Sequence, residues 1–186
     1  INVAQDEIVA DLRVEVEDRD ASVVQNAINE QMREGLIVAR AVTGVDAATG
    51  HYSVYQINRQ PQGGRADPVW RGSQSITLES KDPQTLLSLA GELQDMGFVM
   101  SQLSYRLSTE RADEVRDSLM ETAIARARAN AERAAAALGR PEVEIASLTI
   151  ETGMSYAAPV MMRAMDTGSR EMATPSAEAG ESEVSL

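Results

Sequence analysis

The stretch from Ser104 to Gly139 reads SYRLSTERADEVRDSLMETAIARARANAERAAAALG. It predicts the end of a strand that turns directly into one long helix over about 109–138. Ser108 or Thr109 can cap the first turn, acidic residues come early, arginines come late, and a glycine ends the run. Apolar residues recur along it at steps of three and four, at Ala112, Val115, Leu119, Ala123, Ala127, Ala131, Ala134 and Leu138. Because most of this row is alanine, we expect the helix to lie close against a sheet.

Alternating and helical patterns outside this helix predict an α+β fold. Strands are expected at about 8–17, 51–58, 69–79, 98–107 and 143–151 and from 182 onward, with further helices at about 21–42 and 83–97. Gly35 interrupts the first of these helices at a cost of about 1 kcal/mol relative to alanine. The order β-α-β-β-α-β-α-β-loop-β implies a mainly antiparallel sheet with helices on one face. We expect one domain over 1–186, or two related sub-lobes over about 1–80 and 81–186, with a long loop or arm at 153–180.

Composition limits the classes of function. The chain has 186 residues and a net charge of −12, which disfavours non-specific binding to nucleic acid or anionic lipid because both require a basic face. It has no cysteine, so disulfides, thiolate catalysis and cysteine-ligated zinc are excluded. The sequence contains no run of 18 apolar residues, so it predicts no transmembrane segment. Because both ends of the sequence read as strands, we expect the natural protein to extend further, with a signal peptide removed before Ile1.

Several segments resemble the SIMPL-domain family, formerly a domain of unknown function. They are WRGSQSITLESKD (70–82) with LxxLAxxL (86–93), ARARANAERAAAALG (125–139), the strand pattern at 143–151 and the tail ATPSAEAGESEVSL (173–186). Together they follow the family's order over nearly the whole chain. The N-terminal strand departs from the family pattern, because Gln5-Asp6 stands where the family has a Pro-Asp pair after opening glycines.

The resemblance implies a bacterial envelope protein, periplasmic or associated with the outer membrane, that builds ring-like or channel-like homo-oligomers. It also links the chain to envelope and oxidative stress. No catalytic motif is established for the family, so the resemblance implies no catalytic, cofactor-binding or metal-binding residues. We therefore expect a protein that is not an enzyme.

The residues themselves point to no catalytic motif. His51 is the single histidine, and a Ser-His-Asp relay would need it together with a GxSxG turn that the chain lacks. Histidine-rich or cysteine-rich metal sites are excluded by count. Residues 63–65 (Gly-Gly-Arg) lack the lysine and hydroxyl residue of a phosphate-binding loop. Asp113 and Asp117 share one helix face, where solvated acids near a helix N-terminus are the simpler interpretation.

Methionines gather in the expected arm, with five of the nine between 154 and 172. Met161, Met162 and Met165 are the candidate residues of a contact surface, because methionine adapts its shape at interfaces. An ordinary loop is a second interpretation. Thioethers also bind Cu(I) and are reversibly oxidised, so a metal or redox role is a third, although the segment has no histidine and no repeated MxxM pattern.

Three classes of function follow. The favoured one is a non-enzymatic envelope protein that self-assembles through sheet edges and the methionine-rich arm, with no nucleic-acid partner. The second is a periplasmic binding module, with a ligand between the helices and the loop 60–68, or with Cu(I) on the arm. The third is an enzyme with a site built from Arg, Asp and Tyr side chains, for example Tyr52, Tyr55 and Tyr105.

Overall fold

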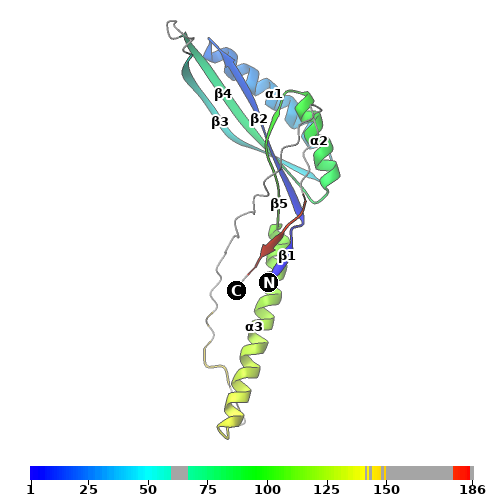
Figure 1. Cartoon of the computed structure of the whole chain (residues 1–186), viewed down its shortest axis with the longest axis vertical. Coiled ribbons are helices and arrows are strands. Elements are labelled where there is room, and N and C mark those ends of the chain that lie inside the picture. Colours follow the sequence, from blue (N-terminus) through cyan, green and yellow to red (C-terminus); the bar gives the residue numbers. More distant parts are fainter. Residues whose placement is uncertain (60–66, 141, 143, 148, 150–177, 185–186) are drawn as a thin grey trace, which may run out of the picture. The chain divides into compact units, whose positions relative to one another are not determined.

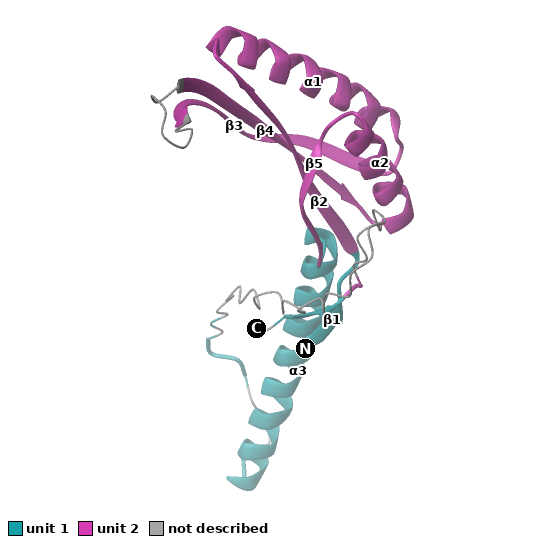
Figure 2. Ribbon diagram, turned by 45° about the horizontal axis from the view of Figure 1, so that its top comes forward, with its two compact units in different colours: residues 1–6, 107–173, 180–186 teal, residues 7–106, 174–179 magenta. Residues whose placement is uncertain are grey.

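The computed structural model describes residues 1–59, 67–140, 142, 144–147, 149 and 178–184. Its elements follow the order β1–β2–α1–β3–β4–α2–β5–α3–β6 (Figure 1). The chain divides into two compact units, with residues 1–6, 107–173 and 180–186 in the first and residues 7–106 and 174–179 in the second (Figure 2). The α+β class predicted from the sequence is confirmed.

The second unit is built on a four-stranded antiparallel sheet. Its strands are β2 (Glu7–Asp18), β3 (Val45–Arg59), β4 (Asp67–Ser80) and β5 (Val99–Arg106), arranged in the order β3–β4–β2–β5. Helices α1 (Ala21–Ala41) and α2 (Pro83–Asp95) cover one face of this sheet (Figure 2). Strands β3 and β5 are therefore its edges.

Two periodicities build the core between this sheet and its helices. Strand residues that face the helices recur every second position, and helix residues that face the sheet recur every three or four. The buried side chains include Ile8, Ala10, Leu12 and Val14 of β2, Ile76 and Leu78 of β4, Val24, Ile28 and Met32 of α1, and Leu86, Leu89 and Leu93 of α2. The hydrophobic core of this unit therefore lies between the sheet and the helices α1 and α2.

Aspartates begin both helices of the second unit. Asp20 accepts a hydrogen bond from the backbone N–H of Ser22 at 2.8 Å, and the hydrogen bonds from Ser22 lower the pKa of the Asp20 carboxyl. Asp82 accepts from Gln84 N at 3.0 Å and from Thr85 Oγ1 at 2.5 Å, and the bond from Thr85 lowers the pKa of Asp82. The ionised carboxylate of each aspartate is therefore the form that accepts these hydrogen bonds and stabilises the first turn of its helix.

The first unit contains a small terminal sheet and the long helix. Strands β1 (Asn2–Ala4) and β6 (Glu181–Glu183) pair antiparallel, and α3 spans Thr109–Ala137. Ser108 is the N-cap of α3, and its Oγ accepts from Arg111 N at 3.2 Å. Asp6 holds this cap, because its carboxylate accepts from Ser108 N at 2.8 Å and from Ser108 Oγ at 2.7 Å. The long helix predicted over about 109–138 is confirmed.

Three details differ from the sequence prediction. Strand β3 begins at Val45 and not near residue 51. The strand expected over 143–151 is absent at its described residues 144–147 and 149, because neither sheet contains a strand from this segment. The row of small residues on α3 was expected to be buried against a sheet, yet Val115 is the only buried residue of the helix. Alanine offers little apolar area for burial, so this row gains less from packing than the leucine-rich faces of the core.

Candidate functional site

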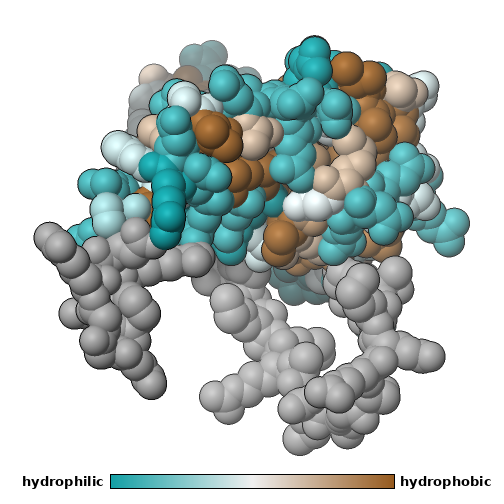
Figure 3. Space-filling model, turned by 90° about the horizontal axis from the view of Figure 1, so that it is seen from above, coloured by the Kyte–Doolittle hydropathy of each residue, from teal (hydrophilic) through white to brown (hydrophobic). Residues whose placement is uncertain are grey.

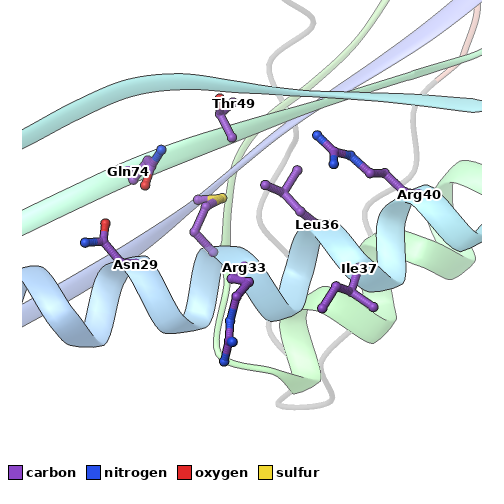
Figure 4. A pocket seen from close by; sticks show the side chains of 8 residues that line it. Asn29, Arg33, Leu36, Ile37, Arg40, Thr49 and Gln74 are labelled. Atoms are coloured by element: carbon purple, nitrogen blue, oxygen red, sulfur yellow. The ribbon is translucent and has the colours of Figure 1, made fainter.

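A groove in the second unit lies between α1 and the strands β3 and β4. It has a volume of about 350 Å³ and is lined by Asn29, Met32, Arg33, Leu36, Ile37 and Arg40 of α1, Thr49 of β3 and Gln74 of β4. In Figure 4, the side chains of Asn29, Leu36 and Arg40 extend from the helix toward the strands that carry Thr49 and Gln74. Those of Arg33 and Ile37 extend away from the strands.

A bulge in β3 brings Thr49 to this groove. Thr49 and Tyr52 are three positions apart, yet both lie opposite helix-facing residues of β4, so residues 50–51 stand opposite Ser75 alone. Bulges redirect side chains and are frequent beside functional sites. Gly50 suits this position, because a Cβ atom there would lie 2.4 Å from the Ser75 hydroxyl oxygen.

Gln74 is a polar residue at a helix-facing position of a central strand. Its partner on β2 is the buried Val14, and the next helix-facing residue of β4 is Ile76. Gln74 is half-buried, and Asn29, Arg40 and Thr49 are exposed, so water can reach all four side chains. Within the described part of the chain, these side chains form no hydrogen bond with another residue. Four polar side chains around one groove are therefore available to water or to a ligand.

The charge of the groove is opposite to that of the protein. Among the described residues, its lining contains two arginines and no acidic residue, whereas the whole chain carries −12. Arg33 approaches Glu30 at 3.8 Å, and both side chains are largely exposed. Arg40 forms no ion pair with any other residue that the structure describes. A guanidinium without an acidic partner favours the approach of an anion.

The helix α3 offers a different kind of surface. Its exposed small residues, which we name the alanine row, are Ala123, Ala127, Ala131 and Ala134. Leu138, in line with this row at the end of the helix, is 79% exposed. Ion pairs one turn apart, such as Arg128 with Glu132 at 3.0 Å, add to the stability of the helix. Because helices usually gain most of their stability by packing one face, the alanine row is an available contact surface.

The face of the sheet opposite the helices carries paired charges. Arg106 donates hydrogen bonds to Glu7 and Glu79, each at 2.6 Å, and the bond to Glu7 raises the pKa of Arg106. Arg71 pairs with Glu17, which raises the pKa of Arg71 in the same way. These pairs fit a solvated surface better than a reactive site. Figure 3, which views the molecule from above, shows hydrophobic residues in groups separated by hydrophilic ones.

The structure separates the tyrosines considered for an enzyme site. Tyr52 and Tyr55 belong to β3 and Tyr105 to β5, which are the two edges of the sheet. Tyr55 lies opposite Arg71 on the face away from the helices, while Tyr52 lies on the helix-covered side. His51 is exposed in the bulge of β3. These residues therefore do not converge on one place.

Other sequence predictions fall outside the described residues. Met161, Met162 and Met165, the expected contact surface, lie there, as do residues 60–66 of the loop expected to border a ligand. Across the described ranges, no group of three or more His, Asp or Glu side chains is arranged to hold a metal ion. No helix in the described part of the chain combines the length and apolar character needed to cross a bilayer.

Comparison with known proteins places the chain in a sequence family. A family model described as SIMPL, protein of unknown function (DUF541), matches residues 1–186. No curated protein matches the chain. One similar solved structure is described as "X-ray crystal structure of a putative amidohydrolase/peptidase from Burkholderia cenocepacia", with 12% identity and a TM-score of 0.31. The match covers 64% of this chain and 33% of that one, so the chain spans about a third of that protein's length, and the likeness carries no functional argument.

Proposed function

The chain belongs to the SIMPL family, and from this premise we propose that it is a non-enzymatic protein of the bacterial cell envelope that assembles from several copies. The observation that carries the proposal is α3, a helix of 29 residues with one buried side chain. A helix of this length with an exposed row of small residues is suited to close packing on another helix. We propose that the row is covered by a second copy of the chain.

The edges of the four-stranded sheet support the same proposal. An edge strand presents unpaired backbone N–H and C=O groups, which can pair with a strand of another copy. Edge strand β3 carries Tyr52 and Tyr55, which are 41% and 48% exposed, and edge strand β5 begins with the exposed Val99. Exposed aromatic residues on an edge are typical of contact surfaces.

Location and biological role rest on the family alone. We propose a periplasmic or outer-membrane-associated protein with a role in envelope or oxidative stress. The alternative function, a periplasmic binding module, is favoured by one specific observation, a groove in which four polar side chains form no hydrogen bond with another described residue. Cu(I) binding by the methionine-rich arm also stays a proposal, since Met161, Met162 and Met165 lie outside the described residues.

The mass of the chain in solution tests the assembly. We expect light scattering to give a mass well above the 20.1 kDa of one chain. Raising the salt concentration should favour assembly, because it screens the repulsion between copies that each carry −12. A monomer at high protein concentration and moderate salt would contradict the proposal.

A pair of matched variants locates the interface. Ala123→Glu places a charge in the alanine row, and Ala125→Glu makes the same change on the opposite side of α3, where the residue is also exposed. Both changes have the same effect on helix propensity. We expect Ala123→Glu to reduce the mass and Ala125→Glu to leave it unchanged. Equal masses for the two variants would show that the row is not the interface.

A further inference from the structure

We infer that the groove between α1, β3 and β4 binds a small organic anion, namely a carboxylate carried on a short apolar chain. This inference is independent of the proposed assembly, because every lining residue belongs to the second unit and none belongs to α3. The groove differs from the opposite face of the sheet, where the charged side chains pair with one another, and the inference assigns a chemical class of ligand to it.

The carboxylate end is recognised by Arg40 and Thr49. Figure 4 shows the Arg40 side chain extending from α1 toward the strands, on the side where Thr49 lies. A guanidinium offers two parallel N–H donors to a carboxylate, and the threonine hydroxyl can add a third. None of the described lining residues is acidic, so none of them competes with the ligand for Arg40.

The apolar chain lies over Leu36 and Met32. Met32 is only 3% exposed and Leu36 packs partly buried against the core, so they form an apolar strip between the polar ends of the groove. Met32 and Arg40 are just over two helical turns apart, roughly 12 Å along the axis, which accommodates an extended chain of about eight carbons. Beyond Met32, Asn29 and Gln74 form a neutral polar end that does not attract a second charge.

The size and charge of the groove favour a small monoanion. Its volume of about 350 Å³ is near the lower limit for small-molecule sites. Arg33, the second arginine of the lining, extends away from the strands in Figure 4. The guanidinium of Arg40 is therefore the one that can contact a ligand inside the groove. A phosphate group, with its larger charge, would call for more donors than this end supplies.

Titration of the full chain with octanoate, followed by amide NMR shifts, tests the inference. We expect saturable shifts at Thr49 and Gln74 with a dissociation constant on the order of 1 mM, as for a ligand of this size. Octanol lacks the charge and acetate lacks the chain, so each should bind at least roughly tenfold more weakly. Octanol binding as tightly as octanoate would overturn the role of Arg40, and inorganic phosphate displacing octanoate would overturn the need for an apolar chain.

Two arginine variants on the same helix sharpen the test. Arg40→Gln removes the guanidinium that extends toward Thr49 and should weaken octanoate binding roughly three- to tenfold. Arg33→Gln removes the same charge from a side chain that extends away, and should change binding less than roughly twofold. Both residues are exposed, so the remaining NMR signals should stay in place and confirm that each variant is folded. Equal weakening by both variants, or no saturable shift with the unaltered chain, would refute the site.

Discussion

Gly35 lies in the middle of α1, and its replacement by alanine measures how tightly that helix packs on Phe98. A Cβ atom at Gly35 would lie 2.5 Å from Cζ and 2.8 Å from Cε2 of the Phe98 ring, far inside van der Waals contact. Phe98 is 3% exposed, so the ring can move only if the core around it moves. Overpacking of this kind costs about 1–3 kcal/mol, while alanine gains about 1 kcal/mol over glycine within a helix. We therefore expect Gly35→Ala to lower the free energy of unfolding by about 0–2 kcal/mol.

Gly91 in α2 is the matched control for this substitution. No neighbouring heavy atom lies within 4 Å of a Cβ atom built there, so Gly91→Ala gains helix propensity without a clash. We expect it to raise the free energy of unfolding by about 0.5–1 kcal/mol. Urea unfolding followed by fluorescence of Trp70, the single tryptophan, reports on the core that contains Phe98. If Gly35→Ala stabilised the protein as much as Gly91→Ala does, the confinement of the ring would be refuted.

Two further predictions concern helix caps. The hydrogen bond from Thr85 lowers the pKa of the Asp82 carboxyl in the folded protein. The stabilisation by the Asp82 cap is therefore complete above the pKa of about 3.9 that the carboxyl has in the unfolded chain, and it is lost as the pH falls through the lower pKa of the folded state. Asp82→Ala should therefore lower the melting temperature more at pH 7 than at pH 3, and equal losses at both would contradict the cap. Ser108→Ala removes the acceptor of Arg111 N and a donor to Asp6, so the free energy of unfolding should fall by about 1–2 kcal/mol. Hydrogen exchange at Arg111 should accelerate, and unchanged protection there would count against the cap.

Most of the second unit could be predicted because its local signals agree with its packing. The alternation of Ile8, Ala10, Leu12 and Val14 needs only a covered sheet face to become a core strand. Gly35 shows the limit of propensity. Taken alone it is a destabilising helix residue, and only the position of Phe98 shows why a larger side chain does not fit.

The groove could not be predicted, because it depends on how β3 meets β4. The bulge at 50–51 places Thr49 on the same face of the sheet as Tyr52, although the two residues are three positions apart. A strict two-residue alternation would place them on opposite faces, so the sequence pattern does not predict this arrangement. Gln74 gave a usable signal, because it is a polar residue in step with Ile76 and Leu78 at helix-facing positions. The periodicity of α3 correctly predicts a helix with one apolar row, but periodicity does not show what covers that row.

The ladder of β1 with β6 bears on the order in which the protein folds. Its neighbouring bond joins Gln5 to Ser182 across 177 residues, and closing a flexible chain of that length costs roughly 4–5 kcal/mol in entropy. Three residue pairs cannot offset that cost while the intervening chain is unstructured, so the ladder forms only after other elements have shortened the path. During synthesis β1 therefore cannot complete its ladder until residues 181–183 of β6 have been added to the chain.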